Sequence, residues 1–203
     1  MAGITLFGNR ESGHTYKVRL ALALAGIDHG FEEIDVVGTP REARPEPFRR
    51  LAKYGEVPLL VHDGQPYVQS NAILLHLAGH TRRLGGESEE RLARVREWLF
   101  WEANRIGFSL PNLRWHTRFE PAEPAVLAML RQRFDADIAR LGQEFSDGRA
   151  FILGDTPTVA DCSLCGYLYF ADQAQVTVPA AVQAWLERIA ALPGWRHPYG
   201  FYA

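Results

Sequence analysis

A polar loop near the start of the chain carries the residues best suited to chemistry. It follows a short apolar segment and leads into a predicted helix, and it brings Ser12, His14 and Tyr16 close to that junction. A helix N-terminus has free N–H groups and a partial positive charge, so a hydroxyl group there can help to stabilise an anion such as a thiolate. Ser12 is the favoured candidate, because Tyr16 falls within the helix. His14 is an alternative, and Ser12 as a simple helix cap stays open.

A second polar pair, Gln69 and Ser70, lies where a predicted strand passes into a predicted helix. Ser70 offers a hydroxyl group, and the helix end offers free N–H groups. Together these groups suit a carboxylate. The alternative interpretation is that Ser70 only caps the helix, and the two roles are compatible.

The two cysteines, Cys162 and Cys165, have the C-x-x-C spacing of a redox pair or of half a zinc site. Tetrahedral zinc would need two more ligands at similar spacing, and the sequence offers no second pair. A redox pair usually stands where a strand meets a helix, whereas these cysteines fall within an apolar helical pattern. We therefore expect two buried, reduced thiols that bind no metal.

The first part of the chain predicts a β-α-β-α-β-β-α order, which gives a mixed sheet with helices on both faces. Short apolar runs bounded by glycine, proline or Asp63-Gly64 predict the strands, and apolar spacing predicts the helices. The predicted strands are 3–8, 31–36, 57–61 and 66–68, and the predicted helices are 18–24, 48–53 and 70–78.

The remainder of the chain predicts helices alone. A glycine-rich segment, 79–88, reads as a linker between a domain at 1–78 and a helical domain at 87–203. Thr158 and Asp161 form a T-x-x-D capping box, which is structural and needs no ligand. The predicted helices of the second domain are 88–114, 125–145, 158–171 and 179–192.

The composition excludes several classes of function. The chain has 203 residues, a formal net charge of −2 and 47% hydrophobic residues, so it has no general attraction to nucleic acid or anionic lipid. No apolar run approaches the roughly 20 residues that cross a bilayer. The N-terminal sequence lacks the basic-then-apolar order of a signal peptide. We expect a soluble, cytoplasmic protein that binds neither membrane nor nucleic acid.

Four motifs together resemble those of the cytosolic glutathione S-transferases. Each motif is weak alone, but they occur in the family's order and span nearly the whole chain. The resemblance implies an α/β thioredoxin-like N-terminal domain followed by an all-α C-terminal domain. The motifs are the first-loop segment from Ser12 through Lys17-Val18-Arg19, the strand start Glu56-Val57-Pro58, the pair Gln69-Ser70, and the capping segment from Gly154 to Asp161.

The resemblance also assigns binding roles. In the family a cis peptide precedes the residue equivalent to Pro58, and the backbone of Val57 would hydrogen-bond the cysteinyl part of glutathione. Gln69 and Ser70 would hold the γ-glutamyl carboxylate. Glu56 departs from the family pattern, where Lys or Gln often stands near the glycine carboxylate, and would repel that carboxylate unless it points away. Its neutralising partner stays open among four basic residues: Arg10, Arg41, Arg44 and Lys53.

The activity that the resemblance implies is conjugation of glutathione to a small hydrophobic electrophile, a detoxification reaction in which Ser12 stabilises the glutathione thiolate. Ser12 replaces the cysteine of redox relatives, which argues against glutaredoxin-like disulfide chemistry. One alternative is a glutathione-dependent isomerase, lyase or peroxidase on the same fold. The other is a non-catalytic binding or regulatory protein.

The second substrate is expected in an apolar cleft between the first loop and the first long helix of the helical domain. His14, Phe108 and Trp115 are its candidate residues, with His116 and Arg118 at a polar rim. The resemblance implies no metal and no organic cofactor beyond the substrate glutathione. It also implies a homodimer.

Overall fold

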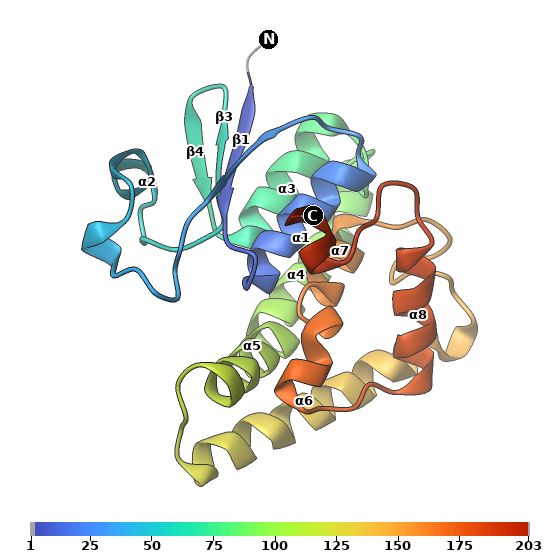
Figure 1. The fold of residues 1–203 in the computed structure, drawn as a ribbon. Coiled ribbons are helices and arrows are strands. Elements are labelled where there is room, and N and C mark those ends of the chain that lie inside the picture. The colour runs from blue at the N-terminus through green and yellow to red at the C-terminus, as the bar shows by residue number, and fades with distance from the viewer. Residues whose placement is uncertain (1–2, 203) are drawn as a thin grey trace.

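The apolar segments of the first part of the chain form one four-stranded sheet in the computed structural model, which describes residues 3–202. The strands stand in the order β2-β1-β3-β4, with β1 parallel to β2 and antiparallel to β3. This is the mixed sheet that the sequence predicts (Figure 1). The strands are β1 (Ile4–Gly8), β2 (Gly30–Glu33), β3 (Leu59–His62) and β4 (Gln65–Val68).

Helices cover both faces of the sheet. Because adjacent side chains of a strand point to opposite faces, Leu6 and Phe7 of β1 belong to two separate cores. Leu6 packs with Val18 and Ile73, whereas Phe7 packs with Phe48. Figure 1 shows α2 on one side of the strands and α1 with α3 on the other. These helices are α1 (Gly13–Leu24), α2 (Glu46–Leu51) and α3 (Ser70–Thr81), and a short 3₁₀ turn, η1 (Arg41–Ala43), precedes α2.

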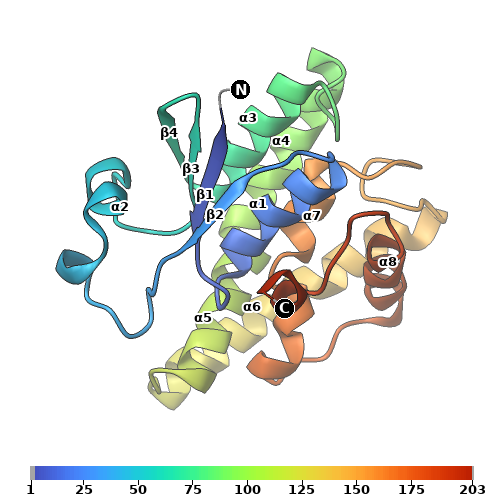
Figure 2. The same ribbon diagram turned by 45° about the horizontal axis from the view of Figure 1, so that its top comes forward.

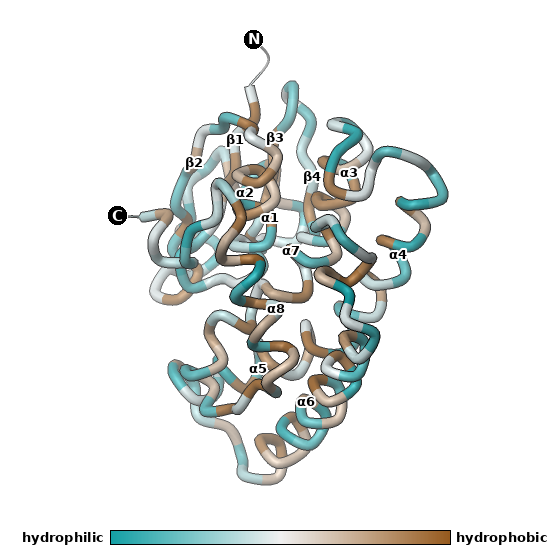
Figure 3. Tube along the Cα trace, turned by 90° about the vertical axis from the view of Figure 1, so that its right-hand side faces the viewer, coloured by the Kyte–Doolittle hydropathy of each residue, from teal (hydrophilic) through white to brown (hydrophobic). Residues whose placement is uncertain are grey.

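After α3, the described chain contains helices, loops and one isolated bridge between Phe151 and Gly154. Hydrophobic and hydrophilic positions alternate along α6 in Figure 3, as expected for a helix with one buried face. No helix within residues 3–202 combines the length and the apolar character needed to cross a membrane. The α-helices are α4 (Glu89–Asn104), α5 (Ile106–Arg118), α6 (Pro124–Glu144), α7 (Val159–Cys165) and α8 (Ala180–Ala190), and the 3₁₀ turns are η2 (Phe145–Asp147), η3 (Leu168–Ala174) and η4 (Pro198–Tyr202).

The prediction of one continuous helix over 88–114 is wrong. Arg105 has a φ of −120° and a ψ of −105°, and this irregular residue separates α4 from α5. Just beyond the break, a Cβ atom at Gly107 would lie 2.2 Å from Oε1 of Glu102. The helix break and the glycine at position 107 therefore make room for the Glu102 carboxylate in the interior.

The helix predicted over 158–171 is shorter than expected. Thr158 and Asp161 form the predicted capping box at the start of α7. The chain then turns at Gly166, where a Cβ atom would lie 2.4 Å from Cγ of Lys17 in α1. A glycine is required at this turn because α1 approaches it so closely.

The helix α7 lies at the meeting point of the two parts of the molecule. All of its residues are buried, and it contacts α1, α3 and α4 (Figures 1 and 2). The hydrophobic core is continuous across this contact, since it includes Leu20 of α1, Leu74 of α3 and Trp185 of α8. Burial of this apolar surface holds the helical part against the sheet.

A buried ion pair lies within the same contact. Nζ of Lys17 stands 2.6 Å from Oε1 of Glu102, and the two side chains are only 1% and 2% exposed. Asn71 of α3 donates a hydrogen bond of 3.0 Å to Oε2 of Glu102. Oγ of Ser163 in α7 lies 3.1 Å from the same oxygen. The network therefore connects α1, α3, α4 and α7.

The surroundings of Glu102 favour its charged form. Burial would raise the pKa of Glu102, but the charge of Lys17, the nearby His14 and the hydrogen bonds from Lys17 and Asn71 outweigh burial and hold the pKa below its ordinary value. Glu102 is therefore ionised at neutral pH. Removal of Lys17 would leave a buried carboxylate without a counter-ion.

We expect Lys17→Met to lower the free energy of unfolding by about 3–5 kcal/mol, because it strands the charge of Glu102. The double variant Lys17→Met/Glu102→Leu should recover part of this loss, since both charges are then absent. Arg50→Met is the control because it breaks an exposed pair with Glu46, and its effect should be far smaller. Urea denaturation measures the three variants, and equal effects of the two Met substitutions would contradict the prediction.

Candidate functional site

A cavity of about 410 Å³ opens beside the N-terminus of α1, which is within the size range of small-molecule sites. Three segments of the sheet domain contribute to its wall, and the helical part contributes α5, the turn that follows it and Tyr167. The predicted site residues Ser12, His14, Glu56, Val57 and Trp115 all line it. Its other lining residues are Glu11, Val36, Val37, Arg41, Arg44, Gly55, Pro111, Arg114, Phe119 and Tyr167.

The loop between β1 and α1 fixes the position of Ser12. Asn9 orders this loop, because its side chain donates to the Ile34 carbonyl at 2.8 Å and accepts from the Glu11 N–H at 2.8 Å. Oγ of Ser12 accepts a hydrogen bond from the Thr15 N–H at 3.1 Å and caps α1. Capping uses a lone pair of the hydroxyl oxygen and leaves its proton free to be donated. The cap and a role toward an anion are therefore compatible at Ser12.

Tyr16, the other hydroxyl considered in this region, points elsewhere. It is 3% exposed, and its hydroxyl group donates to the Arg196 carbonyl at 3.0 Å. Its ring packs edge-on against Tyr169 and Phe201. Tyr16 therefore joins α1 to the end of the chain.

A smaller cavity of about 100 Å³ adjoins the first one, and His14, Glu56 and Val57 line both. Pro58, Gln69 and Ser70 complete the smaller cavity, together with Tyr54 and Val68. The Val57–Pro58 peptide is cis, as predicted. The structure thus brings together the predicted residues of three separate motifs around two connected cavities.

Ser70 does not cap α3, because it is the first residue of that helix and Gln69 occupies the cap position. Gln69 has a φ of 69°, an uncommon conformation for a residue other than glycine. Its side chain makes no capping hydrogen bond, and its Nε2 instead lies 3.4 Å from Oε2 of Glu56. The helix end beside Ser70 therefore has no side-chain cap from its own N-terminal residue.

His14 lines both cavities, with Nδ1 3.5 Å from Oγ of Ser70. Burial, helped by the positive charge of Lys17, lowers the pKa of His14 to about 3, although Glu102 acts in the opposite direction. The imidazole is therefore neutral at physiological pH. It offers a hydrogen bond to a ligand and no positive charge.

Arginine side chains supply the positive charge of the larger cavity. Arg44 is held by the carbonyls of Thr39 at 3.1 Å and Gly55 at 2.6 Å, so it braces the loop before the Val57 segment. Arg41 is exposed and lies 3.8 Å from Glu56. Of the four basic residues considered for the glycine carboxylate, Arg41 and Arg44 line the cavity and Arg10 and Lys53 do not.

Arg114 occupies the opposite wall and is almost completely buried. It forms an ion pair with Glu11 and also donates to the Glu11 carbonyl at 2.6 Å and to Gln173 at 2.8 Å. The hydroxyl group of Tyr199 lies 2.9 Å from the same Glu11 carboxylate. These contacts tie the first loop to α5 and to the end of the chain.

The apolar end of the cavity consists of Pro111, Trp115 and Phe119 of α5 and the following turn, together with Tyr167. The Trp115 and Phe119 rings lie 5.0 Å apart. Phe108, the third residue predicted for the second-substrate cleft, does not line the cavity, and its ring instead lies under the guanidinium of Arg133. The reason is distance along the helix, because Phe108 stands seven residues before Trp115 in α5, on nearly the same face but about 10 Å away along the axis.

Several lining residues are not predicted by the sequence. Glu11 and Arg114 show no local motif, since their pairing joins positions far apart in the chain. Tyr167 sits within an apolar pattern that is typical of core. Phe119 belongs to an aromatic series whose members are more often core than cavity.

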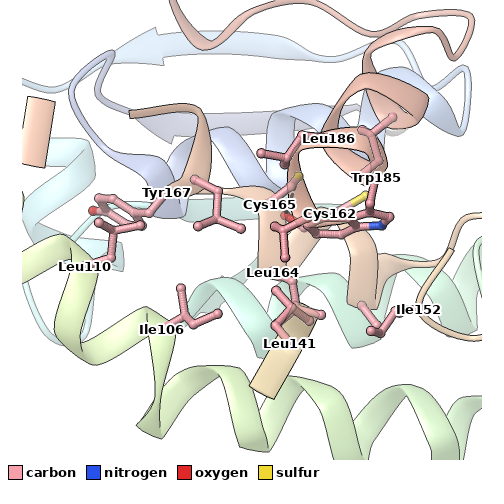
Figure 4. Close-up of a cluster of buried hydrophobic side chains, with 14 of the residues drawn as sticks. Ile106, Leu110, Leu141, Ile152, Cys162, Leu164, Cys165, Tyr167, Trp185 and Leu186 are labelled. Carbon is pink, nitrogen blue, oxygen red and sulfur yellow. Dashed lines mark hydrogen bonds between the residues drawn. The ribbon is translucent and has the colours of Figure 1, made fainter. Parts of the chain in front are cut away.

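The two cysteines lie in the helical core, away from both cavities (Figure 4). Both are reduced, and Sγ of Cys165 lies 3.5 Å from the Cys162 carbonyl. Burial raises the pKa of both thiols, which disfavours the reactive thiolate. Within the described residues, no group of three or more His, Cys, Asp or Glu side chains is arranged to hold a metal ion.

The low pKa of His14 has a measurable consequence. The unfolded chain takes up a proton near pH 6.5, but the folded chain keeps His14 neutral down to about pH 3, so stability falls as the pH drops through this window. His14→Gln removes this contribution and should reduce the loss of unfolding free energy between about pH 7 and about pH 4.5. His197→Gln, at an exposed histidine, should keep the wild-type loss. Urea denaturation at both pH values measures the difference, and identical losses in all three proteins would contradict the prediction.

Comparison with protein families matches both parts of the chain. Residues 2–79 match the glutathione S-transferase N-terminal domain, and residues 124–197 match the glutathione S-transferase C-terminal domain. Each match falls on the part of the structure that has the corresponding architecture. The fold class predicted from the sequence is thereby confirmed.

Individual relatives are similar over nearly their whole length. The chain is 28% identical to disulfide-bond oxidoreductase YfcG of Escherichia coli (strain K12), covering 92% of this chain and 89% of the relative. It is 29% identical to a maleylacetoacetate isomerase of Pseudomonas aeruginosa, covering 95% and 92%. A crystal structure of a glutathione S-transferase from Xanthobacter autotrophicus Py2 matches with a TM-score of 0.85 and 30% identity, covering 98% of each chain. The chain therefore belongs to the glutathione S-transferase family.

Proposed function

We propose that this protein is an enzyme that conjugates glutathione to small hydrophobic electrophiles. The observation that carries the proposal is the gathering of Ser12, Val57 and Ser70 around two connected cavities, next to two helix N-termini. Such helix ends favour anions, and glutathione presents carboxylates and, when activated, a thiolate. The family relationship supports glutathione as the ligand.

The two cavities suit different parts of glutathione. The γ-glutamyl carboxylate would sit at the N-terminus of α3, where Ser70 and the free N–H groups can donate hydrogen bonds. The cysteinyl part would lie beside the backbone of Val57, with its sulfur toward Ser12. The glycine carboxylate would reach Arg41, because Arg44 is already engaged with backbone carbonyls.

Glu56 does not prevent this arrangement. Its carboxylate lies within 3.8 Å of Arg41 and 3.4 Å of Gln69, so its negative charge is shared with groups on either side. A bound carboxylate that draws on Arg41 would compete with Glu56 for the guanidinium. Glu56 therefore tunes the strength of glutathione binding without blocking it.

The electrophile would occupy the apolar end of the larger cavity, beside Pro111, Trp115 and Phe119. There the glutathione thiolate would attack an electrophilic carbon, forming a C–S bond, while the electron pair moves to a leaving group or onto the adjacent atom. This chemistry requires no metal and no organic cofactor. The protein contributes positioning of the two substrates and stabilisation of the thiolate.

A glutathione-dependent isomerase is the second candidate, and the similarity to a maleylacetoacetate isomerase favours it. Reversible addition of the thiolate to a conjugated double bond permits rotation, and elimination then releases glutathione unchanged. Both candidates share the same thiolate, so substrate assays distinguish them.

Isothermal titration calorimetry with glutathione, followed by assays against a panel of electrophiles, tests the proposal. We expect binding at one site per chain and turnover with at least one aromatic halide or activated alkene. Isomerisation of a cis-dicarboxylic alkene without net loss of glutathione would favour the second candidate. Binding without any turnover would favour a non-catalytic glutathione-binding protein, and absence of binding would contradict all three.

Ser70→Ala tests the assigned carboxylate position. Loss of the hydroxyl donor should weaken glutathione binding by about 1–3 kcal/mol, because a charged group loses a hydrogen-bond partner. Ser88→Ala is the matched control, since Ser88 caps α4 through the Arg91 N–H and does not line either cavity. Calorimetry measures both dissociation constants. An unchanged dissociation constant for Ser70→Ala would show that the γ-glutamyl carboxylate does not bind at this position.

We also propose that the chain forms a homodimer, as the family resemblance implies. Phe100 on α4 supports this proposal because the residue is 74% exposed and aromatic residues are frequent anchors of interfaces. Phe100→Ser should shift the mass measured by light scattering toward the monomer at low concentration. Met129→Ser, at an exposed position on α6, should leave the mass unchanged. A monomeric wild-type chain would contradict the proposal.

A further inference from the structure

Tyr167 is a cavity residue contributed by the helical part of the molecule. It follows α7, is 8% exposed and lines the larger cavity together with Ser12 and His14. Figure 4 shows its ring at one end of the core cluster, near Leu110. Neither the conjugation nor the isomerisation described above gives it a role.

The ring of Tyr167 is fixed against the start of α1. A Cβ atom at Gly13 would lie 2.6 Å from Cδ2 of Tyr167, so only glycine lets the ring approach this closely. The ring also packs edge-on against His14, with centroids 4.9 Å apart. These contacts leave the hydroxyl group little freedom to move away from the helix end.

The phenol of Tyr167 keeps its proton in these surroundings. Burial raises the pKa of Tyr167, while the charge of Arg114 and hydrogen bonding with the Ser12 side chain and with the backbone of Gly13 and His14 act in the opposite direction. Burial prevails, so the phenol keeps its proton at physiological pH. A protonated phenol can donate one hydrogen bond.

The neighbouring donors and acceptors limit how the Tyr167 hydroxyl group can be used. Oγ of Ser12 accepts from the Thr15 N–H, so its own proton is free for the phenol oxygen. The backbone N–H groups of Gly13 and His14 are further donors beside the same oxygen. Because Tyr167 lines the cavity and its ring is fixed beside Ser12 and His14, its hydroxyl group can donate its own proton to a ligand bound there.

We infer that the hydroxyl group of Tyr167 donates the hydrogen bond that stabilises the glutathione thiolate, and that Ser12 acts through Tyr167 as a positioning residue. The inference rests on the proposed function, and it names a thiolate donor supplied by the helical domain. On ionisation the glutathione S–H gives its proton to water. Tyr167 keeps its own proton throughout and only donates a hydrogen bond to the sulfur.

The same arrangement explains why the helix end alone is insufficient. The phenol stands close to the backbone of Gly13 and His14, and in this proposal it passes the polarising effect of their N–H groups to the sulfur. Each added donor strengthens the next hydrogen bond in such a chain. The thiolate therefore depends on contact between α1 and the segment after α7.

Tyr167→Phe is the direct test, because it removes only the hydroxyl group and keeps the ring on Gly13. Ultraviolet absorbance of the thiolate, followed as a function of pH with glutathione bound, should show a higher thiol pKa than in the wild-type protein, by about 1 or more. Glutathione affinity measured by calorimetry should change less than about twofold. Turnover near neutral pH should fall about tenfold when the thiol pKa rises by about 1, and it should recover as the pH rises.

Tyr169→Phe is the matched control, since the Tyr169 hydroxyl donates to the Leu186 carbonyl at 2.8 Å and does not line the larger cavity. It should keep the wild-type titration curve. Ser12→Ala should raise the thiol pKa by less than Tyr167→Phe does. The double variant should match Tyr167→Phe, because Ser12 acts through the phenol.

Gly13→Ala provides a second variant that keeps the hydroxyl group but displaces the ring, and it should also raise the thiol pKa. Near-ultraviolet circular dichroism and urea denaturation confirm that each variant is folded. Coincident titration curves for Tyr167→Phe and the wild-type protein, or additive effects of Ser12→Ala and Tyr167→Phe, would overturn the inference and leave the proposed function intact. A wild-type protein that does not bind glutathione would overturn both.

Discussion

The ion pair between Lys17 and Glu102 is the interaction on which the arrangement of this molecule depends. It is buried where α1 meets α4 and α7, and Asn71 and Ser163 complete its hydrogen bonds. A buried pair is stable only when its geometry and its remaining hydrogen bonds are satisfied, so it permits very few relative positions of the helices. The hydrophobic core between the two parts supplies the driving force, and the ion pair selects one arrangement.

Two irregular features follow from this constraint. The break between α4 and α5 lets Gly107 lie against the Glu102 carboxylate, and the turn after α7 has Gly166 because Lys17 passes directly beside it. The second turn also places Tyr167 on the start of α1. The turn at Gly166 therefore has two effects. It makes room for Lys17 of the buried ion pair, and it places Tyr167 in the cavity wall.

The cavity itself is assembled from segments that are far apart in the sequence. The sheet domain contributes two helix N-termini and the Val57 segment, which suit the anionic groups of glutathione, and α5 contributes the apolar surface. His14, held neutral by burial, lines both cavities without adding charge. Members of this family share the fold and differ in chemistry, so differences among them should arise from the residues that face the thiolate and the electrophile.

The sequence by itself determined the order of strands and helices in the sheet domain and the capping box, because each depends on residues that are neighbours in the chain, whereas the cis peptide at Val57–Pro58 was expected from the family resemblance. It also indicated which motifs belong to the cavities. It did not determine the break at Arg105, because a long amphipathic pattern runs across it. It also did not determine that Phe108 lies outside the cavity. The pairing of Lys17 with Glu102 and the placement of Tyr167 over Gly13 were decided only by the tertiary structure, because they join positions whose proximity no local pattern records.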